Sequence, residues 1–336
     1  MKTEFIRQNA GVDISKDDFK VCYSGMTCGV EILKLGSKTF ENNPKGFTSL
    51  LEWVSLKHTG NTEQLPCFTL EATGVYYEEL AYFLLENGYT VHVVLPNQSK
   101  KYGQSLGARS KTDKIDAQIL SQMGLERKLR SWKPFSPNFL KLKQLTRERD
   151  DIICERTSVS NQLHACMYQA KSNGAAIRRA QQRIDLLNQH IDEIEKEIET
   201  LVKSDKSLEK RLSNVLSIPG VGLLTAVTVV AETNGFESIT CIKQLTSFAG
   251  LDVKIAESGK WKGKSKISKQ GNRYIRKVLM FPAFSFIKKY DKAKKYYERL
   301  SEKKGVKMIA AVAVQRKLLG LIYTLWKKQE MFSDKT

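Results

Sequence analysis

The sequence predicts an α/β domain, then a helical coiled-coil middle, then a mainly α-helical C-terminal domain. Three observations lead to this fold class: strand-like runs alternate with helical runs after an opening meander, heptad spacing follows, and apolar helical runs close the chain. A length of 336 residues allows two or three domains with their own cores. We place the domains at residues 1–130, 138–210 and 211–330.

The first domain is expected to hold a mixed α/β sheet. Residues 9–23 suit two strands joined by a tight turn, in which Asp17 and Asp18 are solvated turn residues. The remaining elements follow in order: a strand at 28–39, a helix at 44–56, a strand at 66–70, a helix at 76–87 and a buried strand at 89–95 that Pro96 stops.

Four carboxylates in this domain look like an assembled site. Asp113 and Asp116 are three residues apart at the start of a predicted helix, so both lie on one helical face. Alone, such a pair more often complements the helix dipole. Asp13 lies within the first strand and Glu71 follows the strand at 66–70. Working residues gather at strand ends in such sheets, and hard carboxylate oxygens suit magnesium, so the four predict a divalent-metal site.

The charge balance points to a polyanionic partner. Lys and Arg total 55 against 36 acidic residues, which gives a formal net charge of +19 and a pI near 9.5. Nucleic acid is the usual partner of so basic a chain, although charge can also serve solubility alone. Six cysteines show no metal-ligand spacing, so we expect reduced thiols.

Neither a signal peptide nor a membrane span is expected, and we place the protein in the cytoplasm. The N-terminus lacks an apolar core region. The most apolar stretch, Val306 to Trp326, is interrupted by Gln315-Arg316-Lys317.

The middle of the chain predicts two long helices after a linker at 125–137. The first, 138–171, has apolar residues at heptad spacing, although Arg149 and Arg156 interrupt its second seam. The second carries a cleaner seam that Asp205 interrupts: Ile184, Leu187, Ile191, Ile194, Ile198, Leu201, Leu208, Leu212 and Val215. The pattern fits a coiled coil between chains and also a hairpin within one chain.

The C-terminal domain contains two candidate nucleic-acid contacts. Ile218-Pro219-Gly220-Val221-Gly222 between apolar helical runs resembles a helix-hairpin-helix, whose Gly220 and Gly222 permit a tight turn with amides open to a phosphate. The same pattern also occurs as a purely structural turn. Residues 257–273 are expected to form a flexible basic loop in which Ser268 caps the next helix.

Further candidate nucleic-acid contacts are basic residues of the first domain and of this loop: Arg109, Lys111, Lys260, Lys262, Lys264, Lys266, Lys269 and Arg273.

Helices are expected at 278–287 and 310–326, joined by a charged, solvated connection at 288–304. Composition and spacing alone do not single out any serine of the segment 257–273 as a catalytic residue.

Four motifs in order, VDISKD, LEATG, KTDKIDA and a late SG followed by KISKQGNRYIR, resemble the DEDD-type transposases of insertion-sequence family 110. The resemblance implies an RNase H-like, RuvC-like first domain in which Asp13, Glu71, Asp113 and Asp116 bind Mg²⁺. It also implies a dimerising coiled coil and a catalytic serine, which corresponds to Ser258 here. Glu257 departs from the basic or amide residue usual at that position.

The implied function is that of a transposase that cuts and rejoins DNA through a covalent phosphoserine. Implied partners are double-stranded donor and target DNA, a structured non-coding guide RNA, and further copies of the chain as a dimer, or a tetramer in the synaptic complex. Alternatives are a metal-dependent junction resolvase or nuclease, a site-specific DNA invertase, a sugar kinase of the actin-like type, and a non-catalytic DNA-binding protein. The absence of a second glycine-rich phosphate loop argues against the kinase.

Overall fold

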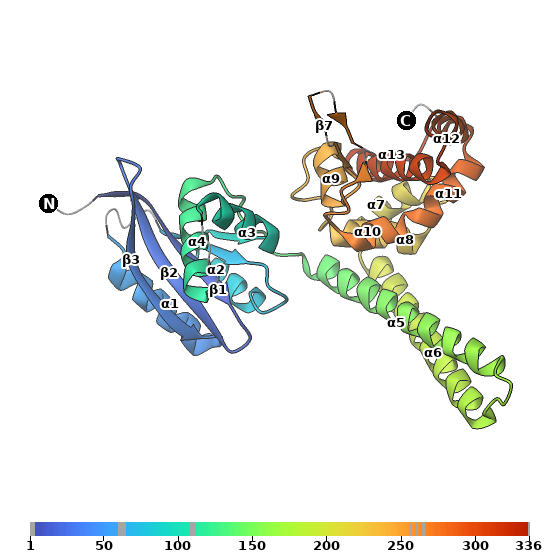
Figure 1. Cartoon of the computed structure of the whole chain (residues 1–336), viewed down its shortest axis with the longest axis horizontal. Helices are drawn as coiled ribbons and strands as arrows, with labels where there is room; N and C mark the ends of the chain where they lie inside the picture. The colour runs from blue at the N-terminus through green and yellow to red at the C-terminus, as the bar shows by residue number, and fades with distance from the viewer. Residues whose placement is uncertain are drawn as a thin grey trace. The chain divides into compact units, whose positions relative to one another are not determined.

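The computed structural model of the chain describes residues 4–59, 65–107, 112–255, 257–259, 261–263 and 266–334. The chain forms two compact units, Met1–Pro134 and Phe135–Thr336 (Figure 1). Each unit is described by itself below.

The first unit is built on a five-stranded mixed sheet of order β3-β2-β1-β4-β5. Its opening meander comprises β1 (Phe5–Ile14), β2 (Asp18–Thr27) and β3 (Ile32–Glu41), which pair antiparallel. The strands β4 (Cys67–Glu71) and β5 (Val91–Val94) extend the sheet in parallel with β1. The predicted mixed sheet with an antiparallel meander is confirmed.

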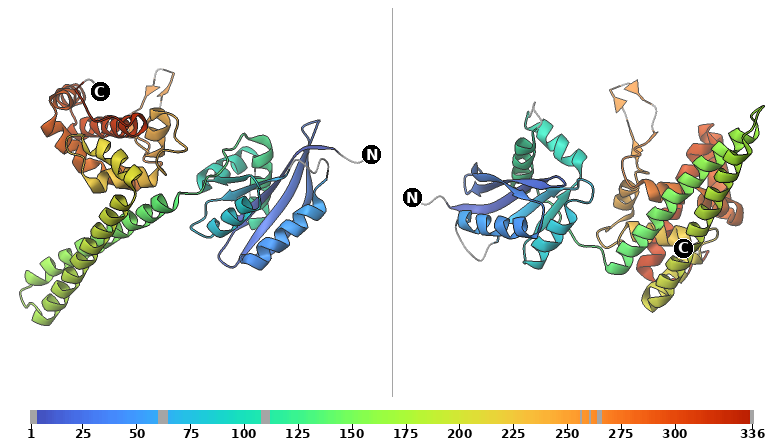
Figure 2. Two further views of the ribbon diagram at one scale, coloured as in Figure 1. Left: turned by 180° about the vertical axis from the view of Figure 1, so that it is seen from behind. Right: turned by 90° about the horizontal axis from the view of Figure 1, so that it is seen from below.

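Helices cover both faces of this sheet (Figure 2). The helices α1 (Pro44–Lys57) and α2 (Glu78–Glu86) bury Phe47, Leu50 and Leu80 against the apolar face that includes Val12 and Phe68. The opposite face carries α3 (Pro96–Ser105) and α4 (Asp113–Glu126). The helix α3 was not predicted: Pro96 ends the strand as expected but also begins a helix, because proline suits the first helical position.

The helix α4 lies unusually close to β1 because residue 11 is glycine. A Cβ atom at Gly11 would stand 2.0 Å from the amide nitrogen of Ser121 and 2.2 Å from the carbonyl oxygen of Ala117. Buried polar groups then fix the helix: Asn9 Nδ2 donates to the Ser121 carbonyl at 2.9 Å, and Ser121 Oγ donates to the Asn9 carbonyl at 3.0 Å. Thr69 Oγ1 on β4 donates to Asn9 Oδ1 at 3.1 Å. The position of α4 on the sheet is therefore fixed by contact and by hydrogen bonds.

The second unit begins with a long antiparallel helical hairpin, α5 (Pro137–Met167) and α6 (Gly174–Ser204), visible in both figures. The predicted seam packs within this single chain, where Val159, Ala180 and Leu187 form its distal core. The arginines that interrupt the first seam have partners on α6: Arg149 pairs with Glu195, and Arg156 donates to Asn188 at 2.8 Å. These contacts lie within one chain, as expected of a hairpin.

The seam does not continue through Asp205, contrary to the single helix expected. Asp205 ends α6 and caps the next helix, α7 (Lys206–Leu216), because its side chain accepts from the Leu208 amide at 3.0 Å. Leu208, Leu212 and Val215 therefore belong to the core of the helical domain. The further helices are α8 (Leu223–Glu232), α9 (Ile242–Phe248), α10 (Arg273–Val278), α11 (Met280–Lys289), α12 (Asp291–Lys304) and α13 (Lys307–Lys328).

One expectation for this domain was wrong. The segment 288–304, expected as a connection, is mostly the helix α12, whose charged residues face solvent while Ala293 is buried. The helix α13 is long and apolar enough to cross a membrane by length and composition alone. Half of its most apolar window is nevertheless buried inside the unit, where Leu318, Ile322 and Trp326 join the core. It serves here as a core helix.

A narrow β-ribbon replaces the flexible loop expected at 257–273. At its base, β6 (Val253–Lys254) pairs with β9 (Lys266–Ile267), and further out β7 (Glu257–Ser258) pairs with β8 (Trp261–Lys262). Ser268 does not cap the following helix. Its hydroxyl donates to Asp252, and Asn272 caps α10 instead.

The base of the ribbon is tied to the hairpin by a buried carboxylate. The Glu232 side chain is 1% exposed and accepts two hydrogen bonds from Arg147 on α5, at 2.6 and 2.8 Å. Asn272 Nδ2, where the chain returns from the ribbon, donates to the same carboxylate at 2.6 Å. These bonds raise the pKa of Arg147, chiefly through the hydrogen bond with Glu232. One carboxylate thus joins α5, α8 and the start of α10.

We predict that Gly11→Ala destabilises the first unit by about 3 kcal/mol or more, because the new methyl group overlaps the backbone of α4. Urea unfolding followed by hydrogen exchange in peptides of the first unit measures the effect. The matched control is Gly29→Ala, where the nearest atom to the added Cβ is Thr27 Oγ1 at 3.7 Å. Equal unfolding midpoints for the two variants would contradict the packing described.

A second prediction concerns the buried carboxylate. Glu232→Ala should cost the second unit about 2–4 kcal/mol, because it leaves Arg147 and Asn272 without their shared acceptor. The comparison is Glu197→Ala, which removes only an exposed ion pair with Lys141 and should cost under about 1 kcal/mol. Thermal unfolding followed by exchange of α8 and α10 peptides tests it, and a loss no larger than the control's would refute the role.

Candidate functional site

The backbone brings four acidic residues, Asp13, Glu71, Asp113 and Asp116, to one corner of the first unit, here called the acidic corner. The parallel pairing of β1 with β4 places Val12 opposite Leu70, so Asp13 and Glu71 are the next residues of the two strands. Neighbouring strands lie about 4.8 Å apart. Side chains alternate along a strand, and Gly11 and Thr69 face α4, so Asp13 and Glu71 face the same way.

The helix α4 brings the other two carboxylates to this corner. It runs opposite to β1: Gly124 lies over Asn9, and Ala117 and Ser121 lie over Gly11. Its N-terminal turn therefore reaches the end of β1 that carries Asp13. Thr112 begins the helix, because its hydroxyl accepts from the Ile115 amide at 3.3 Å. The predicted helix start at Asp113 and Asp116 is confirmed.

Two of the carboxylates are engaged by neighbouring side chains. Lys20 lies opposite Asp13 in the β1–β2 register, and its ammonium forms an ion pair with Asp113, whose side chain is 62% exposed. The Glu71 carboxylate accepts from Ser99 on α3 and, at 3.4 Å, from Thr73. Asp113 and Glu71 therefore interact with different neighbouring side chains.

The electrostatics of Lys20 reflect this acidic environment. The hydrogen bond to Asp113 raises the pKa of Lys20 above its ordinary value. Desolvation opposes this shift, and the charges of Asp113, Asp18 and Asp13 add to it. Lys20 is therefore a cation within the field of at least two acidic-corner residues.

The donor chemistry of the acidic corner fits a hard divalent cation, because all four side chains offer carboxylate oxygens. Among the described residues, no three acidic, histidine or cysteine side chains stand close enough to hold a metal ion together. Asp113 is paired with Lys20 and Glu71 accepts from Ser99, so metal binding would require both carboxylates to exchange these partners.

Ser258 lies in the second unit, on the outer part of the β-ribbon. It is exposed and pairs through its backbone with Trp261, which is itself 62% exposed. Gly259 follows with a φ of 57°, a left-handed conformation that favours glycine and lets the ribbon turn directly after the serine. Glu257 lies opposite Lys262 in the same ladder.

The predicted nucleic-acid contacts are partly described. Arg109, Lys111, Lys260 and Lys264 lie outside the described residues, and only the backbone of Lys262 is described. Lys266, Lys269 and Arg273 are exposed on or beside the ribbon. In the turn between α7 and α8, Gly220 packs on α11, since a Cβ there would meet Ser285 at 2.8 Å. Gly222 is exposed at the start of α8. The role of these two glycines in phosphate binding stays a prediction.

Sequence reasoning missed Lys20, Ser99, Asn9 and Ser121. A signal existed for Lys20, because a hairpin with its turn at residues 15–17 places it opposite Asp13. The alternation Asn9, Gly11, Asp13 was also visible as one strand face. Ser99 and Ser121 gave no signal, since serine is common in helices without a special role.

A family model described as a transposase, of the DEDD type and IS110, matches residues 10–172. A second model, described as a transposase of the IS116/IS110/IS902 family, matches residues 212–298. Together the two models span both units.

Two relatives are similar over nearly the whole chain. A pilin gene-inverting protein of Moraxella bovis is 30% identical and covers 97% of each chain. A transposase for insertion sequence element IS1111A of Coxiella burnetii is 25% identical over 96% of this chain and 90% of its own. The solved RuvC structure of Thermus thermophilus aligns with 37% of this chain and 99% of its own, at 11% identity and a TM-score of 0.28.

Proposed function

Because this chain belongs to the IS110 family of transposases, which are DNA phosphoryl-transfer enzymes, we propose that it cuts and rejoins DNA through Ser258 with help from the acidic corner. The observation that carries the proposal is a pair of features on separate units: acidic residues at neighbouring strand ends and at a helix start on the first, and an exposed serine on the ribbon of the second. Nucleases of the DEDD and RuvC-like type generally use divalent metal ions.

The acidic corner would hold Mg²⁺ through Asp13, Glu71, Asp113 and Asp116, and the bound ion would polarise the phosphodiester. The chain's own contribution is positional. The fixed contact of α4 with β1 keeps Asp113 and Asp116 at the strand ends, and Lys20 supplies a cation beside them. A phosphate arriving at the corner would meet both.

Ser258 acts as the nucleophile in this proposal. Its Oγ forms a bond to the phosphorus of the scissile phosphodiester while the bond from phosphorus to one deoxyribose oxygen breaks. The serine proton leaves, and the departing sugar oxygen gains one, so atoms and charge balance. The phosphoserine conserves the energy of the broken linkage, and attack by another sugar hydroxyl reverses the step and rejoins DNA. An exposed ribbon suits a serine that must reach a DNA backbone.

Three finer features belong to the same proposal. The two half-sites lie on different units, so we infer an active site shared between copies of the chain, in a dimer or a tetramer holding donor and target DNA. We also infer a structured non-coding RNA as guide, as in the resembling family, which the charge of +19 suits. Transposition and inversion share this chemistry. The similarity to a pilin gene-inverting protein makes DNA inversion an alternative biological use.

The variant Ser258→Ala distinguishes the proposed serine recombinase from a metal-dependent nuclease. We predict that this variant loses covalent attachment to DNA and strand exchange entirely, whereas a water-using nuclease would continue to cut. The assay isolates protein from cells that carry the gene with its natural flanking DNA, then detects labelled DNA bound to protein on a denaturing gel.

Asp116→Asn tests the acidic corner in the same assay and should reduce adduct formation by at least about a hundredfold. Asp17→Asn, in the exposed turn after β1, is the matched control and should leave the adduct unchanged. Persistent DNA cutting by Ser258→Ala without an adduct would establish the nuclease reading instead.

We further predict that Lys20→Met strengthens divalent-metal binding by about threefold to tenfold, because it frees Asp113 and removes a competing positive charge. Mn²⁺ titration followed by electron paramagnetic resonance measures this without activity. Lys34→Met, an exposed lysine on β3, is the control. Unchanged or weaker Mn²⁺ binding in Lys20→Met would contradict the competition.

A further inference from the structure

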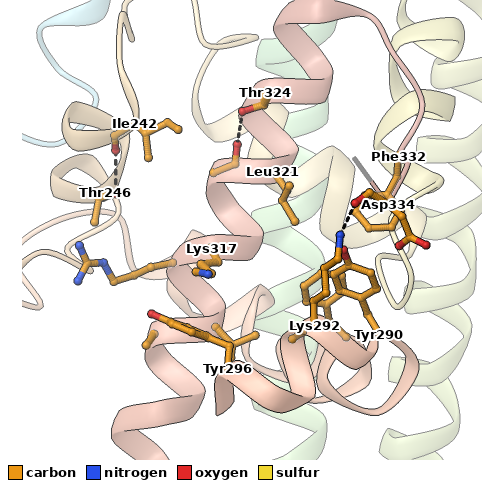
Figure 3. Close-up of a pocket in the computed structure, with 16 residues that line it drawn as sticks. Ile242, Thr246, Tyr290, Lys292, Tyr296, Lys317, Leu321, Thr324, Phe332 and Asp334 are labelled. Atoms are coloured by element: carbon orange, nitrogen blue, oxygen red, sulfur yellow. Dashed lines mark hydrogen bonds between the residues drawn. The ribbon is translucent and has the colours of Figure 1, made fainter. Parts of the chain in front are cut away.

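A cavity of about 670 Å³ lies in the second unit, away from the residues discussed so far. Figure 3 shows it between α9, α12, α13 and the C-terminal segment. Its floor is apolar and includes Val314 and Leu321 on α13. Gly320 contributes to the floor without a side chain, and a Cβ there would meet Ile242 only at an ordinary 3.6 Å. The volume is in the range of small-molecule sites.

The rim of this cavity is positively charged. Lys292, Arg316 and Lys317 line it, and among the described lining residues Asp334 is the acidic one. The ammonium of Lys292 donates to the backbone carbonyl of Asp334. Within the part of the chain that the structure describes, neither Arg316 nor Lys317 has a carboxylate at salt-bridge distance. Two cations beside one cavity without acidic partners call for an anionic ligand.

Aromatic side chains stand next to these cations (Figure 3). The Lys317 ammonium lies 3.8 Å from the ring centroid of Tyr296, which is half-buried in the cavity wall. Tyr290 and Phe332 line the other side, with their ring centroids 5.2 Å apart in an edge-on arrangement. Because Lys317 is exposed on a flexible stem, it can leave the ring of Tyr296 for a phosphate. Arg299 is a second cation near this ring, 5.5 Å from its centroid.

We propose that this cavity takes one unstacked nucleotide of a single-stranded nucleic-acid segment. The base stacks on Tyr296 over the apolar floor, and Arg316 and Lys317 bind the flanking phosphates. Single-stranded sites combine these same parts, an aromatic platform and a basic groove. An acidic peptide that lacks aromatic residues would satisfy the cations but would offer no flat ring to stack on Tyr296. The inference rests on nucleic acid as the partner and is independent of Ser258 as nucleophile.

The test uses the full-length protein and fluorescein-labelled 12-nucleotide oligo(U) and oligo(dT), with binding measured by fluorescence anisotropy. Tyr296→Ala should weaken binding by about 5-fold to 100-fold through lost stacking, and Tyr296→Trp should retain it. Lys317→Ala should lower the slope of log K against log salt by about 0.7, the value for one phosphate contact on a single strand. The tighter of the two oligonucleotides identifies the source as RNA or DNA.

Charge controls come from the same helices. Lys295→Glu on α12 and Lys328→Glu on α13 are exposed but do not line the cavity, so they report the effect of net charge alone. Lys317→Glu should weaken binding at least about fivefold more than either control. Equal losses in Lys317→Glu and the controls, or full binding by a folded Tyr296→Ala, would overturn the proposal.

Photo-crosslinking gives an independent result. Oligo(U) that contains 4-thiouridine should attach to peptides of α12 or α13 that line the cavity, identified by mass spectrometry. Attachment confined to other peptides would refute the site. The Ser258 adduct assay separates the two proposals: Ser258→Ala should keep oligonucleotide binding, and Tyr296→Ala should keep an intact acidic corner, as its Mn²⁺ titration would report.

Discussion

The close approach of α4 to β1 is the constraint on which the acidic corner depends. Backbone atoms of Ala117 and Ser121 occupy the space that any side chain at residue 11 would need. That contact sets the height of the helix above the sheet, and the buried hydrogen bonds between Asn9 and Ser121 set its position along β1. A shift by one helical residue would move Asp113 and Asp116 by about 1.5 Å, a displacement large enough to matter to metal coordination.

Much of the first unit could be predicted because its signals are local. The alternation of side chains gave the meander, and the spacing of Asp113 and Asp116 gave a helix start that Thr112 does cap. The placement of Asp13 and Glu71 at neighbouring strand ends also followed from strand-end reasoning, whereas a shared metal site for the four carboxylates stays a prediction. The present partners of the carboxylates did not follow from it, because the ion pair of Lys20 with Asp113 joins residues 93 positions apart and depends on how α4 crosses the sheet. Sequence periodicity holds no such information.

Errors in the second unit have equally physical causes. We expected Asp205 to interrupt the heptad seam of one continuous helix. A short acidic side chain can instead cap a new helix, and here Asp205 accepts a hydrogen bond from the Leu208 amide. The segment 288–304 was expected to be a connection because most of its residues are charged, and the small apolar face around Ala293 gives little helical periodicity. The ribbon was missed because its two-residue ladders are too short for alternation to be visible, and its shape depends on pairing across the loop.

The helical hairpin has a consequence for how the enzyme can vary. Because α5 and α6 run antiparallel, the chain enters and leaves the hairpin at the same end, next to the core that holds Leu142 and Val202. Adding or removing matched turns at the far tip, around Asn173, would lengthen or shorten the arm without shifting either attachment point. The length of the arm can therefore change while the core of the second unit keeps its structure.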